Sequence, residues 1–493
     1  MLAVKICDND NVAVAVSDLK CGEDVLVDGV KIVLQNDIPN GHKFAVHNIS
    51  ANESVVKYGY PIGLATEEIS IGQHVHNHNV KSDIKGVSEY TYQPQFAELP
   101  KKKGGCFQGY RRADGKTGIR NEVWIIPTVG CVNNIVSEIE KQSQVYKTDN
   151  IDGIYSYNHP YGCSQLGDDQ LNTLKFLTGM INHPNAAAVL VVGLGCENGN
   201  IDELKKVLGE HDEQRIRFLV CQECSNEIDC GVEIVKELCN YADGFKREPI
   251  SVSELVIGLK CGGSDGFSGI TANPLLGRVS DRIIAEGGSA ILTEVPEMFG
   301  AETILMNRCR LEEVFNKTVD LINDFKNYFI KYGERVDENP SPGNKAGGIT
   351  TLADKSLGCV QKGGTAPVED VLQYGQQVRE KGLSLLSAPG NDLVASCALM
   401  SSGAHIVLFT TGRGTPFGCP VPTVKISSNS ALFNKKSAWI DFDAGRLFDG
   451  ESFDGLQDEL YSFILKVASG EAVTKSELLS KRDLSIFKDG VTL

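Results

Sequence analysis

From about residue 110 onward, short apolar segments alternate with longer amphipathic ones. The apolar segments are VWIIPTV, AAAVLVVGLG, RIRFLVCQ, LVIGLKCGG, SAILTEV, LSLLSAPG, HIVLFTTG and SAWIDFD. Their length and flanking glycines predict strands that are buried on both faces. The stretch 318–333 instead predicts an amphipathic helix, because apolar residues recur at helical spacing: Val319, Ile322, Phe325, Phe329 and Ile330. This alternation predicts layered α/β domains with mostly parallel sheets.

Residues 1–95 have a different pattern. Short apolar segments such as VAVAVSDL, DVLVDGVKIVL and SVVKYGYPIGLA alternate with turn residues, which predicts a compact antiparallel barrel or clip. Residues 96–109 contain a Lys run and a Gly pair without periodicity, so we expect a linker. The segment KREPISVS divides the rest. The 493 residues exceed one ordinary core, and we expect further domains at 110–247 and 252–493.

The charge and hydropathy exclude several classes of protein. A formal net charge of −16 argues against non-specific binding to nucleic acid, although a few local cations can still hold a carboxylate substrate. No apolar run reaches the ~18–20 residues of a membrane span. The first residues, MLAVKICDND, lack the pattern of a signal peptide. We therefore expect a cytoplasmic chain that binds neither nucleic acid nor membrane, with its 15 cysteines present as thiols or metal ligands.

Glycine-rich polar loops follow five of the predicted strands. They read GLGCENG, CGGSDGFSG, EVPEMFGAE, APGNDLVAS and TGRGTPFG. The carboxyl ends of parallel strands form the ligand crevice of open sheets, and glycines let the backbone approach a ligand closely. The alternative is that these glycines only serve turns. Arginine can bind a carboxylate bidentately. As substrate-binding residues we expect Arg120, Arg413, Ser264, Asp265 and Asn391.

The loop GLGCENG does not complete a dinucleotide fingerprint. Gly193 and Gly195 follow a strand, but the third glycine of the pattern is replaced by Asn198. We therefore expect no NAD.

Four cysteines lie beside glycine in predicted loops: Cys163, Cys196, Cys261 and Cys359. Thiolates are soft ligands that suit iron or zinc. The sequence leaves open whether they hold a single ion or whether three of them hold an iron–sulfur cluster. Cys221 and Cys224 form a lone CxxC, for which we expect a structural role.

Three of the nine histidines fall in GQHVHNHNVK, as His74, His76 and His78. In an extended segment, alternate side chains point the same way, so all three imidazoles would share one face. This face, with His42 added, would supply metal ligands or a catalytic acid, because imidazole binds metals and titrates near neutral pH. The alternative is a polar strand face that meets water.

Lysines and carboxylates in glycine-rich loops complete the candidates. A desolvated lysine can act as a base, and a crowded carboxylate can act as an acid or a ligand. As catalytic residues we expect His76, Lys345, Lys362 and Glu297. As metal ligands we expect His76, His78, Cys163, Cys261 and Cys359.

The chain resembles the altronate/galactarate dehydratase family over essentially its whole length. Stretches that carry the resemblance include GHKFA, KYGYPIG, GQHVHNHN, YRRADGKTGIRNEVWIIPTVGCVN, YGCSQLGDD, CGGSDGFSGITANPLLGR, TEVPEMFGAE and NPSPGNKAGGITTLADKSLGC. The resemblance implies an SAF-type β domain followed by two dehydratase domains. It implies dehydration of D-altronate to 2-dehydro-3-deoxy-D-gluconate in galacturonate catabolism, with Fe²⁺ or another divalent metal such as Mn²⁺. An iron–sulfur cluster is the second choice.

Other functions remain open at this point. The substrate could be another sugar acid, such as galactarate, or a sulfonated hydroxy acid. The chain could also bind a sugar acid without turning it over. We expect it to act on a small molecule as a homo-oligomer, a dimer.

Overall fold

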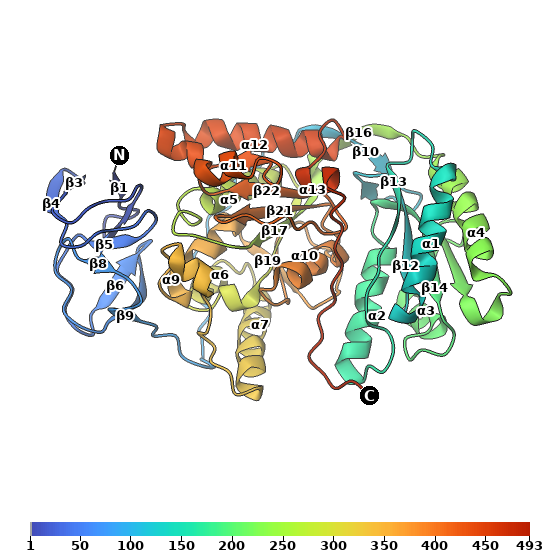
Figure 1. The fold of residues 1–493 in the computed structure, drawn as a ribbon, viewed down its shortest axis with the longest axis horizontal. Coiled ribbons are helices and arrows are strands. Elements are labelled where there is room, and N and C mark those ends of the chain that lie inside the picture. Colours follow the sequence, from blue (N-terminus) through green and yellow to red (C-terminus); the bar gives the residue numbers. More distant parts are fainter. Residues whose placement is uncertain (1) are drawn as a thin grey trace.

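The computed structural model describes residues 2–493, which form three units arranged in a row (Figure 1). The N-terminal β domain, residues 2–83, lies at one end, and the second domain, which begins near residue 106, lies at the other. The C-terminal domain, from residue 252 onward, lies between them. The order in space therefore differs from the order in the sequence, and the C-terminal domain contacts both of the others. None of the helices in residues 2–493 is long and apolar enough to cross a membrane.

The N-terminal β domain consists of short antiparallel strands. One sheet has the order β1-β2-β5-β8, another β6-β7-β9, and β3 pairs with β4 in a hairpin. Alternate side chains such as Val25, Ile32 and Phe44 point inward and are fully or almost fully buried. The predicted compact β domain is confirmed. Its strands are β1 Ala3–Val4, β2 Val12–Ala15, β3 Asp24–Val27, β4 Val30–Val33, β5 Lys43–Ala45, β6 Ser54–Lys57, β7 Tyr60–Ala65, β8 His74–Val75 and β9 Val80–Lys81.

The histidine stretch is not extended, contrary to our expectation. Strand β8 ends at Val75, and the chain turns over residues 76–79. The turn forms because the Asn79 side chain accepts a hydrogen bond from His76 N at 2.9 Å, while His76 O accepts one from Val80 N at 2.9 Å. An asparagine that bonds the backbone in this way competes with strand pairing. The imidazoles therefore gather around a turn and do not share one strand face.

Residues 84–105 run along the C-terminal domain without forming a strand or helix. Tyr92 Oη, for example, donates to Arg310 O at 3.1 Å. Strand β10, Cys106–Arg111, then pairs antiparallel with β11, Thr117–Gly118, and with β16, Arg247–Ser251. Strand β10 thus begins inside the range expected as a linker, and β16 lies at the expected break near residue 250. The domain boundaries themselves stay a prediction.

The second domain has a four-stranded parallel sheet of order β13-β12-β14-β15. Along β12, Val123 and Ile125 pack under α1 and α4, whereas Trp124 and Ile126 face α2 and α3. Both faces are buried, as the continuous apolar runs predicted. The elements are β12 Glu122–Pro127, α1 Asn133–Ser143, β13 Gly153–Ser156, α2 Gly167–Ile181, β14 Ala186–Gly193, α3 Ile201–Leu208, β15 Ile216–Val220 and α4 Glu227–Ala242.

The C-terminal domain is built on seven parallel strands in the order β19-β20-β18-β17-β21-β22-β23. The prediction of α/β layers with mostly parallel sheets is therefore confirmed. The strands are β17 Val256–Cys261, β18 Ser289–Leu292, β19 Val368–Leu372, β20 Gly382–Leu386, β21 Ile406–Thr411, β22 Thr423–Ser427 and β23 Phe442–Asp443. The helices are α5 Ala272–Ala285, α6 Glu302–Met306, α7 Glu312–Lys331, α8 Pro342–Ala346, α9 Leu352–Cys359, α10 Asp392–Ser401, α11 Ser430–Lys435, α12 Phe453–Ala468 and α13 Lys475–Leu478.

Three details of this domain differ from the sequence-based prediction. Strands β19 and β22 were missed, because charged residues such as Asp370 and Lys425 interrupt their apolar runs. In SAWIDFD only Phe442 and Asp443 form a strand. The predicted helix begins earlier, at Glu312, and its last turn extends past the core, so that Ile330 is 51% exposed and does not belong to the buried face.

The N-terminal β domain packs against the C-terminal domain through backbone and buried ion pairs. A Cβ atom at Gly266 would lie 2.0 Å from Gly41 O, and one at Gly348 would lie 2.1 Å from the same atom. Only glycine allows this approach. Beside it, the carboxylate of Asp354 on α9 accepts hydrogen bonds from Lys43 at 2.8 Å and Lys57 at 3.0 Å. All three charged side chains are almost fully buried.

Asp354→Asn tests this contact. The substitution leaves two buried lysines without a carboxylate, so we expect a loss of ~3–5 kcal/mol in the free energy of unfolding, measured by chemical denaturation. Burial opposes ionisation of Asp354, but Lys43 and Lys57 hold its pKa below the ordinary value. The stabilisation by the Asp354 ion pairs is therefore present above about pH 4 and is lost as the pH falls below that value. The stability of the Asp354→Asn variant should depend less on pH in this acidic range. Asp37→Asn, at an exposed ion pair, is the control, and an equal loss in both variants would contradict the prediction.

Candidate active site and metal centre

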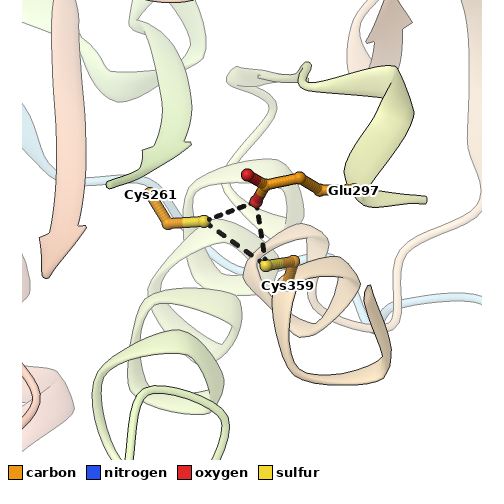
Figure 2. Close-up of side chains that lie close together, drawn as sticks. All are labelled: Cys261, Glu297 and Cys359. Carbon is orange, nitrogen blue, oxygen red and sulfur yellow. Dashed lines mark hydrogen bonds between the residues drawn. The ribbon is translucent and has the colours of Figure 1, made fainter. Parts of the chain in front are cut away.

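Two thiols and a carboxylate meet at the carboxyl edge of the seven-stranded sheet (Figure 2). Cys261 is the last residue of β17, Cys359 ends α9, and Glu297 lies in the short helix Val295–Glu297 after β18. The two Sγ atoms are 3.4 Å apart, and Glu297 Oε2 lies 3.1 Å from each. All three residues are buried. Within residues 2–493, this is the one group of three or more His, Cys, Asp or Glu residues whose ligand atoms all lie within 4.8 Å of one another.

Three lysines and two further carboxylates surround this triad. Lys355 Nζ is 2.7 Å from Glu297, and Lys362 Nζ is 3.3 Å from Glu294. Lys260 contacts Glu294 and also lies 3.0 Å from Asp392, the first residue of α10. Only Asp392 reaches the surface, with a side chain that is 35% exposed.

The charges of this group balance, and a divalent metal would keep the balance. Three ammonium groups face three carboxylates, so two neutral thiols leave a net charge of zero. A divalent ion that displaces the two thiol protons adds two positive charges and creates two negative ones. Two thiolates with one carboxylate are a donor set that suits iron or zinc. The residues present therefore fit a divalent metal without an unpaired buried charge.

The lysines of the site are held as cations. Burial opposes the charge on Lys362, but the sulfurs of Cys261 and Cys359 and the nearby carboxylates outweigh it and raise the lysine pKa well above the ordinary value. The pKa of Lys355 is raised for the same reason, chiefly by Glu297. The hydrogen bond with Cys261 and burial raise the pKa of Cys359. Protonated lysines do not act as bases, so these side chains are suited to stabilise negative charge.

Glu294 is held in a backbone conformation that is rare for its residue type. It has φ 71° and ψ 57°, in the left-handed region, and is fully buried. Its carboxylate accepts hydrogen bonds from Cys261 N, at 2.8 Å, and from Lys260. Backbone strain of this kind persists where surrounding contacts fix it, and it is concentrated at functional sites.

The histidines form a second group on the N-terminal β domain, where it meets the C-terminal domain. His42 Nδ1 lies 3.0 Å from His74 Nε2, and the rings of His42 and His76 are 4.8 Å apart. His76 Nδ1 lies 3.2 Å from Thr350 Oγ1. Burial and neighbouring positive charge lower the pKa of His76 to about 3 and that of His74 to about 4. These two imidazoles are therefore neutral at pH 7, whereas His78 lies at the exposed end of the turn.

Helix α9 connects the histidine group with the triad. Thr350, which contacts His76, donates its backbone N–H to Asp354 at 2.9 Å. The next residue, Lys355, forms the ion pair with Glu297. Beside Cys359 and α9 is a cavity of about 10 Å³, lined among others by Ser264 and Lys355. A volume of this size holds about one water molecule.

The structure brings several predicted residues to this region. Cys261, Cys359, Glu297 and Lys362 lie together, as described above. Ser264 lines the small cavity, and its buried hydroxyl has no hydrogen-bond partner among residues 2–493. Arg413 is exposed in the loop after β21, and its side chain lies next to Gly263 and Gly343.

Other predicted residues lie elsewhere or have their polar groups occupied. Arg120 is buried and binds the carboxylate of Glu477, with Nε 2.9 Å from Oε1, so it cannot hold a substrate carboxylate as we expected. Asp265 is partly buried, and its carboxylate accepts hydrogen bonds from Ser268 N in its own loop and from the side chains of Ser428 and Asn429. Asn391 Oδ1 caps α10.

Two further predicted residues are not part of the triad. Cys163 is exposed on the second domain, so the predicted metal ligands lie in three separate places. Lys345 is half-buried on α8, and its ammonium forms no ion pair within residues 2–493.

Three charged residues of the site were not predicted from the sequence: Lys260, Lys355 and Asp392. Lys260 carried a usable signal, because a lysine inside the apolar run LVIGLKC must find a buried partner. Lys355 and Asp392 lie in helices, where a charged residue is ordinary and gives no signal.

Comparison with known proteins agrees with this architecture. Residues 252–492 match the family model described as D-galactarate/altronate dehydratase, C-terminal, and residues 109–243 match the second domain of D-galactarate dehydratase/altronate hydrolase. Residues 1–83 match the altronate/galactarate dehydratase SAF domain. Altronate dehydratase of Escherichia coli (strain K12) is 52% identical over 496 residues, which cover 100% of both chains. The chain belongs to the altronate/galactarate dehydratase family.

Two further members of the altronate/galactarate dehydratase family show how similarity varies. Altronate dehydratase of Bacillus subtilis (strain 168) is 54% identical over 99% of both chains. Galactarate dehydratase (L-threo-forming) of Escherichia coli (strain K12) is 33% identical over 96% of this chain and 94% of its own.

Metal titration tests the triad. Co²⁺ bound by two thiolates gives a strong near-ultraviolet sulfur-to-metal absorption, which we expect in the wild-type protein and not in Cys359→Ser. Cys309→Ser, at a buried thiol outside the triad, is the matched control. The same absorption in all three proteins would place the metal elsewhere.

Proposed function

We propose that the protein is a hydro-lyase that converts D-altronate to 2-dehydro-3-deoxy-D-gluconate, in the cytoplasm, as a step of galacturonate catabolism. The choice of substrate rests on the full-length sequence identity with two altronate dehydratases, which is 52% and 54%. The relative named galactarate dehydratase is only 33% identical. A dimer is the assembly we propose.

The chemistry requires stabilisation of a carbanion next to a carboxylate. The C2 proton of a 2,3-dihydroxy acid is very weakly acidic, and its removal places charge on the carboxylate oxygens as an enediolate. Fixed cations that face those oxygens lower the barrier. Lys355 and Lys362 are cations held in a buried site, and Lys362 is assigned to the substrate carboxylate because its nearest carboxylate partner is 3.3 Å away.

The metal that the family implies would bind at Cys261, Cys359 and Glu297, and we propose Fe²⁺, with Mn²⁺ as the alternative. A divalent ion at this place supplies Lewis-acid stabilisation of an oxygen on the substrate. The neighbouring lysines would fix the substrate's orientation, and the unpaired hydroxyl of Ser264 would donate to one of its oxygens.

Proton transfer is assigned to His76. Its Nδ1 is fixed by Thr350 Oγ1, which leaves Nε2 directed away from that contact to take or return a proton. The low pKa of about 3 keeps the ring neutral before substrate binds. The carboxylate of a bound substrate would make protonation of the His76 ring more favourable.

Substrate entry requires the site to open. The cavity of about 10 Å³ is far smaller than a six-carbon acid. Asp265 and Ile349 line this cavity, and the neighbouring Gly266 and Gly348 pack against Gly41, where the N-terminal β domain meets the C-terminal domain. Separation of these loops would admit substrate, and their return would exclude water from the reacting groups.

The decisive assay is 2-keto acid formation under anaerobic conditions from D-altronate, galactarate and D-mannonate. Metal-depleted protein would be supplied with Fe²⁺, Mn²⁺, Mg²⁺ or no metal. We expect product from D-altronate with Fe²⁺. Failure of all three substrates with a folded, metal-loaded protein would contradict the proposal and favour a sugar-acid binding protein.

Lys362→Met should lower kcat/KM for D-altronate about 100-fold or more, because it removes a cation that faces the developing charge. Lys331→Met, at the exposed end of α7, should keep wild-type activity. Circular dichroism would check that both variants are folded. Near-normal turnover by folded Lys362→Met would remove this lysine from the site.

His76→Gln should lower kcat about 100-fold while KM changes little, because the glutamine can keep the contact with Thr350 but cannot transfer a proton. His47→Gln, an exposed histidine of the same domain, is the control. A large rise in KM without loss of kcat would indicate a binding role instead.

A further inference from the structure

The second domain carries three Gly–Cys pairs in equivalent places. They are Gly130–Cys131, Gly162–Cys163 and Gly195–Cys196, and they follow β12, β13 and β14. These strands are parallel and adjacent, in the order β13-β12-β14, so the loops after them emerge at the same edge of the sheet. None of these cysteines belongs to the triad of Cys261, Glu297 and Cys359.

The loops touch one another through their backbones. Gly130 N donates to Tyr161 O at 2.9 Å, and Gly199 N donates to Gly162 O at 3.2 Å. A Cβ atom at Gly162 would lie 1.9 Å from Thr128 O. The glycine before Cys163 therefore permits the contact that brings this loop against the one that carries Cys131.

The three thiols are free and exposed, although unpaired cysteine is among the residues most often buried. The Cys163 sulfur has two distant contacts, with Asn198 Oδ1 at 4.0 Å and with Ser164 Oγ at 3.9 Å. The Cys196 sulfur accepts a hydrogen bond from Gln222 Nε2 at 3.5 Å. N–H donors aimed at sulfur are typical of metal-bound thiolates.

The positive ends of three helices lie at the same edge. Helix α1 begins two residues after Cys131, α2 begins four after Cys163, and α3 begins five after Cys196. Each helix returns from the carboxyl end of its strand, so its N-terminus faces the loop region. Helix N-termini favour bound negative charge. A cluster of charge 2+ held by three thiolates carries a net negative charge.

The three sulfurs lie too far apart to bind a single tetrahedral ion without moving. A tetrahedral metal with bonds of ~2.3 Å to sulfur holds its thiolates about 3.8 Å apart. Within residues 2–493, the three thiols do not form a group within 4.8 Å, whereas the buried triad does. An iron–sulfur cube binds each thiolate on a different iron and so spans a wider group.

We propose that Cys131, Cys163 and Cys196 ligate a [4Fe–4S] cluster at the carboxyl edge of the second domain's sheet, with one iron left free of cysteine. Each thiol loses its proton as its sulfur bonds to iron. Two Fe²⁺, two Fe³⁺ and four sulfide ions form the cluster without a further oxidant or reductant. The site is separate from the buried triad, and the proposal does not depend on the proposed substrate or activity.

The test is anaerobic reconstitution of the full chain with equal amounts of Fe²⁺ and Fe³⁺ plus sulfide, followed by desalting. We expect about four acid-labile sulfide and four iron per chain, besides one iron at the buried triad, and visible absorbance that bleaches on reduction. Cys131→Ser, Cys163→Ser and Cys196→Ser should each lower the iron and sulfide content at least twofold. Cys106→Ser, at an exposed thiol on β10, should bind as wild type.

Alkylation of wild-type protein keeps the test valid if a serine variant fails to fold. In reconstituted protein we expect the three thiols to be protected from iodoacetamide, and to react once the cluster is removed. Three outcomes would overturn the proposal: iron uptake without sulfide, unchanged uptake by folded serine variants, or a cluster lost only in Cys261→Ser or Cys359→Ser. All readouts are metal content or labelling, so failure here is distinct from failure of the proposed dehydratase activity.

Discussion

The ion pair between Lys355 and Glu297 is the interaction on which the candidate active site depends. Glu297 contacts both thiols of the triad, and Lys355 fixes its other oxygen at 2.7 Å. Lys355 follows Asp354 on α9, and Asp354 binds two lysines of the N-terminal β domain. Adjacent residues of one short helix therefore connect the docking of a domain with the position of the carboxylate of the triad. Buried charges of this kind are stable only when every partner is present.

Glycines have a different role here from the one that loop composition suggests. The loops after β17 and before α9 are glycine-rich, which is typical of backbone that approaches a ligand. In the structure, Gly266 and Gly348 instead let the backbone of the C-terminal domain approach Gly41 of the N-terminal β domain. The same contacts place the histidines beside Thr350. The domain interface and the site are thus parts of one arrangement.

The cysteines divide into two groups with opposite environments. Cys261 and Cys359 are buried among lysines and carboxylates, where two thiols can exchange their protons for one divalent ion at constant charge. Cys131, Cys163 and Cys196 are exposed at the edge of another sheet, beside three helix N-termini. In the sequence, Cys163, Cys261 and Cys359 look alike, because each lies beside glycine in a predicted loop.

The sequence by itself determined the fold class, because periodicity and glycine placement are local properties of neighbouring residues. It also singled out Cys261, Cys359, Glu297 and Lys362. It could not show that Arg120 pairs with Glu477, 357 positions away, and is therefore not free to bind substrate. Only the tertiary structure decided which charged groups meet, since burial and pairing depend on distances between segments far apart in the chain. For the same reason Cys163 lies with other exposed thiols and not with Cys261.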